Sequence, residues 1–247
     1  MQKGSEHGYL TVMNDDETRV YTGDISRLIE DGGLYECYLG ELSSYRRDKA
    51  EKYKNQDDRC RSVGAGILLK RALSDCGLSE KDVKYGTTGN GKPVIEGFPG
   101  INFNLSHSKN RVMCIVSGRV VGCDVEQVRD RGASGKRIPE RFFSEEERAY
   151  LKRAGSNDKE KYDEAFFTVW TLKESYIKCT GEGLERAMEG FSVIDASGCF
   201  MVKEDRSVLL KVLESDDPDD FSYRYAVCIK KRTPDDEQVI IRRRIIF

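Results

Sequence analysis

The spacing of apolar residues and the presence of helix caps predict four helices. In Arg59–Cys76, apolar residues such as Val63 and Ile67 recur at helical spacing, and Gly77 then stops the helix. Ser144 is followed by three glutamates, a pattern that caps a helix and places acids at its positive end. The predicted helices are Ser43 or Ser44 to about Asn55, Arg59 to Cys76, one started by Ser144, and Asp163 to about Thr180, stopped by Gly181.

Strand-like runs of apolar and β-branched residues lie before and after these helices. Two polar stretches that contain glycine separate some of the runs: Thr87–Pro93 is predicted to be a loop, and Gln127–Pro139 a mobile segment. The predicted strands are Gly8–Met13, Gly33–Leu39, Ile101–Leu105, Arg111–Ser117, Val120–Glu126, Phe191–Ala196, Val208–Leu213, Phe221–Ile229 and Val239–Ile246.

The order helix, helix, strands occurs twice along the chain. We therefore predict an α+β fold of two similar halves, residues 1–120 and 121–247, related by a pseudo-twofold axis. Ligand sites form preferentially where two such units meet, so the active site is expected in the cleft between the halves.

The composition is that of a water-soluble globular protein, with 38% hydrophobic and 34% charged residues among 247. No apolar run is long enough for a transmembrane helix, and the first residues lack the apolar core of a signal peptide. The eight cysteines include no CxxC pair, so we expect reduced thiols in a cytoplasmic protein. A net charge of −2 argues against nucleic acid as a partner, and we expect a monomer.

Two groups of polar residues could meet around a hard cation. On the last predicted helix, Trp170, Glu174 and Lys178 share one face because they are four residues apart. On an upstream strand, Asp124 and Glu126 point to the same side of the sheet. Mg²⁺ prefers oxygen ligands and commonly binds one or two carboxylates together with substrate phosphates. This chemistry suits an enzyme that handles phosphates.

Each group also has a purely structural interpretation. Asp124 and Glu126 could form an exposed acidic strand edge, and Glu174 with Lys178 an ordinary surface ion pair. The only tryptophan, Trp170, argues against a solvated helix face, because indoles are rarely fully exposed. The valines around the strand carboxylates favour a half-buried pair, which requires a cation.

Basic residues are concentrated in the first half. Residues 43–71 contain nine Lys or Arg and four Asp or Glu. Lys49 and Lys52 share a helix face, and Arg61 opens the next helix. This arrangement could be a solvated face or an anion site that reaches into the cleft.

His107 lies just past a strand and is flanked by Ser106 and Ser108. It could be a structural hydrogen-bonding group, or the loop could bind phosphate through hydroxyls, imidazole and backbone N–H groups. No P-loop, GxGxxG or GxSxG sequence occurs, so any nucleotide must be held in another way.

Several short motifs follow one another in a specific order from about residue 40 to residue 230. They are Asp48–Lys52, Arg61, Asn90–Pro93, Phe103–Ser108, Gly122–Glu126, Arg141–Glu147, Trp170–Lys178 and Gly181–Leu184. The ordered set resembles the 4′-phosphopantetheinyl transferases of the large, surfactin-synthetase-activating type. The Gly122–Glu126 and Trp170–Lys178 motifs are the most specific part of this resemblance. The family fold is two similar α+β halves, as the pattern predicts.

The resemblance implies an enzyme that moves the 4′-phosphopantetheine group of coenzyme A to a serine of an apo acyl or peptidyl carrier protein and releases 3′,5′-ADP. Coenzyme A would bind between the halves, with Mg²⁺ or alternatively Mn²⁺ on its pyrophosphate. The implied metal ligands are Asp124, Glu126 and Glu174. Lys178 would contact the phosphates and steady the leaving group. The general base would be Glu174 or a metal-bound water held near Glu147.

The resemblance also implies residues that bind the rest of coenzyme A. Position 90 is commonly aromatic in the family and is Asn here, so stacking of this residue on adenine is not implied. The implied contacts are Lys49, Lys52, Arg61 and His107 at the 3′-phosphate, Ser106 and His107 at the pyrophosphate, and Asn90, Gly91, Lys92 and Pro93 on the adenine side.

Two other functions remain open at this stage. The chain could be a regulatory protein that binds coenzyme A or a nucleotide and has lost catalysis, although all three carboxylates and the lysine are present. A metal-dependent nuclease is disfavoured by the acidic balance and the lack of a basic stripe. The sequence leaves open whether a fatty-acid, polyketide or peptide synthetase carrier would be served.

Overall fold

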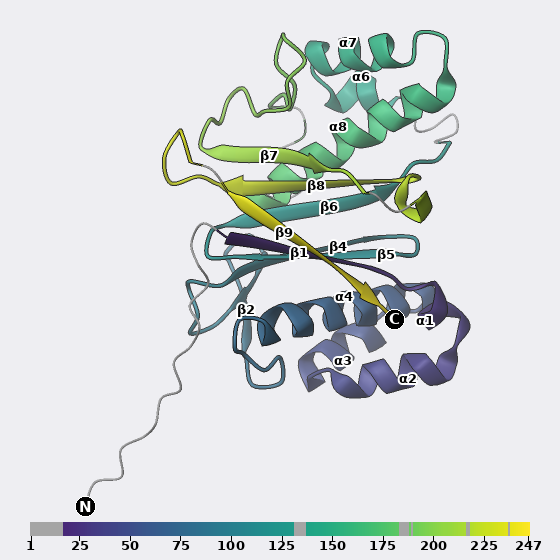
Figure 1. Ribbon diagram of the computed structural model, residues 1–247, viewed down its shortest axis with the longest axis vertical. Coiled ribbons are helices and arrows are strands. Elements are labelled where there is room, and N and C mark those ends of the chain that lie inside the picture. Colours follow the sequence, from purple (N-terminus) through teal and green to yellow (C-terminus); the bar gives the residue numbers. More distant parts are fainter. Residues whose placement is uncertain (1–16, 131–136, 183–187, 189, 216–217, 237) are drawn as a thin grey trace, which may run out of the picture.

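The computed structural model describes residues 17–130, 137–182, 188, 190–215, 218–236 and 238–247 (Figure 1). The predicted α+β class is confirmed, and no helix in this part of the chain is long and apolar enough to cross a membrane. The helices are α1 (Ser26–Glu30), α2 (Gly32–Glu41), α3 (Ser44–Glu51), α4 (Gln56–Ser74), α6 (Ile138–Phe142), α7 (Glu145–Ala154) and α8 (Lys159–Thr180). The strands are β1 (Glu17–Asp24), β2 (Tyr85–Thr87), β3 (Pro93–Ile95), β4 (Asn102–Ser108), β5 (Arg111–Ser117), β6 (Val121–Gln127), β7 (Val208–Leu213), β8 (Tyr223–Lys230) and β9 (Val239–Ile246).

The described residues form two main sheets and one small hairpin. A four-stranded sheet has the order β4-β5-β1-β9, a three-stranded sheet has the order β6-β8-β7, and β2 pairs with β3. Helices α1 to α4 lie on the outer side of the first sheet, whereas α8 lies across the second, with α6 and α7 beyond it (Figure 1). The two sheets therefore lie in the middle of the molecule, and the helices lie outside.

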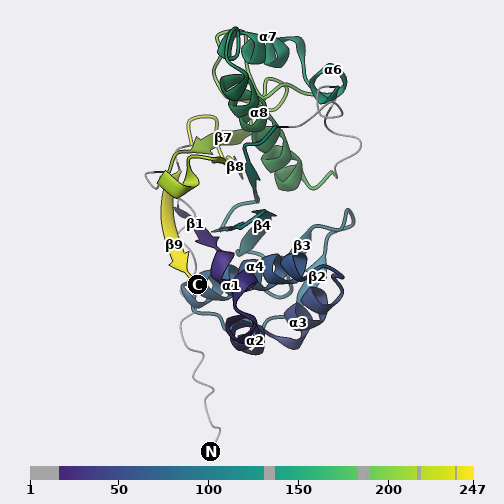
Figure 2. The ribbon, with the colours of Figure 1, turned by 90° about the vertical axis from the view of Figure 1, so that its right-hand side faces the viewer.

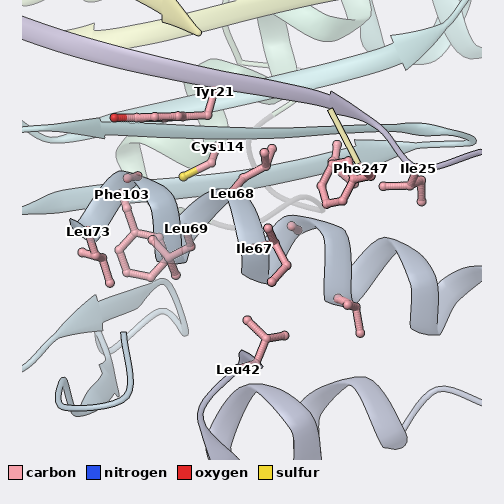
Figure 3. Close-up of a cluster of buried hydrophobic side chains, with 14 of the residues drawn as sticks. Tyr21, Ile25, Leu42, Ile67, Leu68, Leu69, Leu73, Phe103, Cys114 and Phe247 are labelled. Atoms are coloured by element: carbon pink, nitrogen blue, oxygen red, sulfur yellow. The ribbon is translucent and has the colours of Figure 1, made fainter. Parts of the chain in front are cut away.

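Three apolar clusters hold these layers together. The first lies between α4 and the first sheet, where Leu68, Leu69 and Phe103 are buried (Figure 3). The second lies beneath α8, and the third lies between the two sheets, where Met113 and Val227 are buried. The first sheet buries apolar side chains on both faces, which explains why β5 is apolar from Val112 to Val116.

Strand β9 crosses from the second half back to the first sheet, where it pairs in parallel with β1 (Figure 2). Phe247, directly after β9, is buried in the first core, and a side chain at Gly23 would collide with its ring. The C-terminal strand is thus part of the first sheet, not of the half that a division at residue 120 would give it. The pseudo-twofold relation between the halves remains a prediction.

Most predicted elements are present, with shifted ends. Helix α8 begins at Lys159, earlier than predicted, because the Asp158 side chain accepts from the N–H groups of Glu160 and Lys161. The α7 capping box and the stop at Gly181, whose φ is 76°, are confirmed. The eight cysteines are all free thiols. The predicted strand Gly8–Met13, and residues 131–136 of the segment predicted to be mobile, lie outside the described residues.

Two predicted strands are wrong. Gly33–Leu39 belongs to helix α2, which Asp31 caps by accepting from the Leu34 N–H. Phe191–Ala196 is irregular apart from one bridge between Ile194 and Phe200.

Candidate functional site

Helix α8 presents Glu174 and Lys178 to the line where the two sheets meet. Its N–H groups are capped by Asp158, and its last turn ends at Gly181, whose N–H donates to Ile177 O at 2.8 Å. One turn apart on the same face, Glu174 is 7% exposed and Lys178 reaches across to β6. The Lys178 Nζ donates to Asp124 Oδ1 at 2.6 Å.

Strands β4 and β6 face each other across the two sheets, and side chains of β4 join them. On β4, the alternate residues Asn104, Ser106 and Ser108 direct their oxygens toward β6. One edge of β6 pairs with β8, and these oxygens accept from the backbone N–H groups on its other edge. The three bonds are Cys123 N–H to Asn104 Oδ1 at 3.0 Å, Val125 N–H to Ser106 Oγ at 3.4 Å, and Gln127 N–H to Ser108 Oγ at 3.2 Å.

The two serines of this row also orient the strand carboxylates. Ser106 Oγ donates to Asp124 Oδ1, and Ser108 Oγ donates to Glu126 Oε2, both at 2.7 Å. Because each hydroxyl already accepts a backbone N–H, its own proton is directed at the carboxylate. Ser106 also accepts from the Lys178 Nζ at 3.1 Å and is 5% exposed. Its hydroxyl is therefore engaged by protein groups rather than facing open solvent.

The carboxylates perturb one another. Burial raises the pKa of Glu174 to about 7, and the charge of Asp124 acts in the same direction. Burial and Asp124 also raise the pKa of Glu126. Burial alone would lower the pKa of Lys178, but Asp124 outweighs it and raises that pKa above its usual range. The site therefore holds more negative charge than Lys178 neutralises by itself.

The donor set fits a hard divalent cation. Asp124 Oδ2 is buried and has no hydrogen-bond partner among the described residues. The charge of Asp124 raises the pKa values of both Glu126 and Glu174, so the three carboxylates lie in one region. Within the described residues, however, no three His, Cys, Asp or Glu side chains are already arranged as a metal centre. Lys178 currently occupies one oxygen of Asp124.

Two small cavities lie beside these groups and share Pro93 and Asn104 in their walls. The cavity of about 220 Å³ contains Glu174 and Lys178 in its wall, together with the loop from Asn90 to Pro93. The second, of about 120 Å³, is lined by Tyr45, Arg46, Lys49, Tyr85, Pro93, Phe103, Asn104 and Leu105. The structure thus brings the predicted adenine-side loop to the carboxylates, and Lys49 to the adjoining cavity.

The loop from Asn90 to Pro93 is tied to the second half by Lys92. The Lys92 Nζ donates to Val121 O at 2.7 Å and to Cys179 O at 3.0 Å. The latter is a carbonyl of the last turn of α8, where a cation is favoured by the helix dipole. Burial lowers the pKa of Lys92. Its ammonium therefore joins the β2–β3 hairpin to the end of α8.

Of the other predicted cations, Lys49 lines the second cavity. Burial lowers the pKa of Lys49, and the charges of Arg46 and Lys52 act in the same direction. Lys52 is exposed at the end of α3. Arg61 pairs with Asp58 at 2.6 Å and donates to Lys109 O.

His107 links this cationic region to Lys178. Its side chain is exposed, and desolvation by neighbouring atoms lowers its pKa, with Arg61 and Lys178 acting in the same direction. The imidazole thus lies in the field of a cation from each half of the molecule.

Arg46 is a member of this group that the sequence interpretation missed. It is 4% exposed, its Nη2 donates to Ser62 O at 3.4 Å, and its buried Nε has no partner among the described residues. The available signal was its spacing of three residues from Lys49 on a basic helix, which puts both cations on one face.

Glu147 is not placed with the other predicted catalytic residues. It is completely buried, and both of its oxygens lie 3.2 Å from the Lys173 Nζ. The same oxygens accept from the N–H groups of Ser144 at 2.7 Å and Val193 at 2.8 Å. Its oxygens are thus engaged by protein groups, and the general-base role of a metal-bound water held near Glu147 stays a prediction. Trp170, also expected near the site, stacks on Phe166 at the edge of the second core.

Comparison with known proteins agrees with this geometry. The profile of the 4′-phosphopantetheinyl transferase superfamily matches residues 120–228, which include β6 and α8. The 4′-phosphopantetheinyl transferase psf-1 of Bacillus pumilus is 30% identical over 198 residues, which cover 77% of this chain and 79% of that protein. The 4′-phosphopantetheinyl transferase Sfp of Bacillus subtilis is 28% identical over 201 residues, which cover 78% and 84%. HetI of Nostoc is 33% identical over 153 residues, covering 60% and 63%.

The chain therefore belongs to the 4′-phosphopantetheinyl transferase family and is an enzyme of the transferase class. Within that family it is of the Sfp-like type, as its motifs indicate.

Proposed function

We propose that this protein transfers the 4′-phosphopantetheine group of coenzyme A to a serine of an apo acyl or peptidyl carrier protein, with Mg²⁺, and releases 3′,5′-ADP. The observation that carries the proposal is the Lys178–Asp124 pair at the junction of the two halves, with Asp124 Oδ2 buried and unpartnered beside Glu126 and Glu174. An excess of carboxylates next to one lysine and a cavity suits a metal-bound polyphosphate.

The reaction breaks one P–O bond and forms another. The serine hydroxyl attacks the β-phosphorus of coenzyme A, and the bond from this phosphorus to the bridging oxygen breaks. The α-phosphate leaves as part of 3′,5′-ADP, and the serine proton must pass to a base. Asp124, Glu126 and Glu174 would hold Mg²⁺, which when bound neutralises charge on the pyrophosphate.

Lys178 is proposed to stabilise the charge that develops on the leaving α-phosphate. Its ammonium already lies 2.6 Å from one carboxylate and is kept protonated by the surrounding charges. Glu174 is proposed as the proton acceptor, because its carboxylate lies in the cavity wall beside Lys178.

The cations of the first half are proposed to bind the 3′-phosphate. The cavity that contains Arg46 and Lys49 adjoins the one that contains Lys178, and the charges of Arg61 and Lys178 both lower the pKa of His107. Charge-assisted bonds to phosphate are stronger than neutral ones, so this group should supply much of the affinity for coenzyme A. Lys52 is exposed and would act from the rim.

The test is incubation with coenzyme A and Mg²⁺ and a panel of apo carrier proteins, followed by intact mass measurement. A carrier should gain one phosphopantetheine group, and EDTA should prevent the gain. A Lys178→Ala variant treated identically controls for contaminating transferases. If coenzyme A binds but no carrier in a broad panel gains mass, the chain is a binding protein that has lost catalysis.

A further inference from the structure

Two thiols from different elements meet beneath the end of α8. Cys179 lies in the last turn of α8, and Cys228 lies within β8, which α8 crosses (Figure 1). Their exposed fractions are 2% and 0%, and both belong to the second apolar cluster. Neither has a role in the proposed transfer.

Gly122 allows the end of α8 to approach β6 closely, because it has no side chain. A Cβ at Gly122 would lie 2.3 Å from Cys179 N and 2.9 Å from its Cα, so the helix backbone rests directly on β6 at this point. Gly122 is also the cross-strand partner of Cys228 in the ladder between β6 and β8. The Cα atoms of the paired residues Gly122 and Cys228 are about 5 Å apart across the strands. Cys179 lies above Gly122, in a direction roughly perpendicular to that separation. The Cα atoms of Cys179 and Cys228 are therefore about 6 Å apart. Disulfides span Cα separations of about 4.4–6.8 Å.

The thiols already interact. The neighbouring Cys228 thiol is the largest influence that lowers the pKa of Cys179, and the Lys92 ammonium acts in the same direction. The Cys179 thiol itself donates to Val120 O at 3.5 Å. Thiolate character makes a cysteine reactive towards oxidants.

Cys179 borders a space that a small molecule can enter, although little of its own surface is exposed. It lines a cavity of about 350 Å³ between the end of α8 and the β2–β3 hairpin. The opposite wall includes Thr88, Gly89 and Asn90, which are exposed. A peroxide molecule is close to water in size and fits this space.

We propose that Cys179 and Cys228 form an oxidant-sensitive site that closes to an intramolecular disulfide. The Cys179 thiolate attacks one oxygen of hydrogen peroxide, the O–O bond breaks, and sulfenic acid and water form once the leaving oxygen takes up a proton. The Cys228 sulfur then attacks the sulfenic sulfur, the S–S bond forms and a second water leaves. Two thiols are oxidised, and one peroxide is reduced to two waters.

The disulfide would tether the last turn of α8 to the middle of β8. That turn carries Lys178, which pairs with Asp124, and the Cys179 carbonyl, which accepts a hydrogen bond from the Lys92 ammonium. Oxidation is therefore expected to restrict the helix turn that positions Lys178, the residue proposed to stabilise the leaving α-phosphate. This consequence rests on the proposed function, whereas formation of the disulfide does not.

The site is tested in a Cys37→Ser/Cys199→Ser background, which removes the two exposed thiols. After mild peroxide treatment and alkylation, intact mass should show the loss of two hydrogens, and peptide mapping should find Cys179 joined to Cys228. Dithiothreitol should reverse both. Adding Cys228→Ser should abolish the cross-link and leave a sulfenic acid at Cys179 that dimedone traps. Adding Cys60→Ser, a buried thiol elsewhere, should change nothing. Absence of the cross-link, or a cross-link between other cysteines, overturns the proposal.

A turnover assay on the same samples separates regulation from function. Phosphopantetheinyl transfer by the background protein should fall at least tenfold as the cross-link forms and recover with dithiothreitol, whereas Cys179→Ser in this background should keep its turnover in peroxide. Full turnover in cross-linked protein would overturn the regulatory consequence alone. Absence of turnover before oxidation would instead count against the proposed function.

Discussion

Two lysines of helix α8 each pair with a buried carboxylate, but the two pairs differ in their exposure to solvent. Lys173 and Glu147 are completely buried, with side-chain exposures of 0% each. Lys178 and Asp124 have side-chain exposures of 28% and 5% and lie at a cavity wall. The first pair is closed to solvent and to ligands, and the second is open on the lysine side.

The pairs differ in how fully their polar atoms are satisfied. Glu147 accepts from two backbone N–H groups as well as from Lys173, and Lys173 also donates to Phe191 O at 2.6 Å. Asp124 keeps one buried oxygen without a partner, and two further carboxylates crowd it. A buried pair with every group satisfied serves the fold, whereas an unsatisfied one with excess charge marks a site for a ligand.

Removing one partner of the closed pair should have the largest effect. In Lys173→Met, the Glu147 carboxylate is left buried and unpaired, so the free energy of unfolding should fall by about 3–5 kcal/mol. Urea denaturation measures this directly. The double variant Lys173→Met/Glu147→Leu should recover most of the loss, because no buried charge remains. A fall below about 1 kcal/mol in the single variant would show that the pair is not closed.

Removing the lysine of the open pair should affect rate rather than stability. Turnover of Lys178→Ala should fall by about two orders of magnitude, the scale for losing one electrostatic stabiliser of a transition state. The melting temperature should change little, and coenzyme A should still bind through the 3′-phosphate contacts. Steady-state kinetics and calorimetry provide the measurements. Near-normal turnover here and in Glu174→Gln would contradict the proposed roles of both residues in the transfer.

The crowded carboxylates of the open site should make the metal-free protein sensitive to pH. The folded-state pKa of Glu174, about 7, lies above its ordinary value of 4.5, so Glu174 favours folding below about pH 4.5 and loses this contribution as pH rises through 7. Glu174→Gln abolishes this loss. In EDTA, the variant should match the wild type near pH 5 and exceed it at pH 8 by about 1–3 kcal/mol in unfolding free energy. Equal stability of the two proteins at pH 8 would contradict this account.

The smallest effect concerns the cations that adjoin the open pair. Removing the 3′-phosphate from coenzyme A should weaken binding about tenfold or more, because a charge-assisted contact is lost. Lys49→Ala and Arg61→Ala should abolish the preference for coenzyme A over dephospho-coenzyme A, while Lys81→Ala, an exposed lysine outside the cavity walls, should retain it. Calorimetry with both ligands decides, and equal affinities for the wild type would refute the 3′-phosphate assignment.

The sequence was sufficient for the elements that carry strong local signals. The capping box at Ser144 and the glycine at position 181 fix the ends of α7 and α8, and the apolar runs of β5 and β6 are recognisable as strands. Asp124, Glu174 and Lys178 could be proposed from spacing alone, because a strand and a helix each repeat with a known period.

The errors arise where distant contacts decide the outcome. Gly33–Leu39 contains a glycine and two tyrosines that disfavour helix, yet it is helical because Tyr35 is buried in the first core. Phe191–Ala196 does not continue as a strand because the Val193 N–H donates to Glu147 and the Ser192 N–H to Glu204. The side-chain row from β4 to β6 has no local signature either, since it depends on two strands lying side by side.

The pairing of β9 with β1 means that the first sheet cannot be completed until the end of the described chain has been synthesised. During synthesis β1 is among the first strands of the sheet to leave the ribosome, and its neighbour β9 follows only after every other described element. Until then one edge of β1 offers unpaired N–H and C=O groups, and the place that Phe247 fills in the first core is empty. Nascent chains that stall before Val239 are thus expected to expose an unpaired, aggregation-prone strand edge and to bind chaperones.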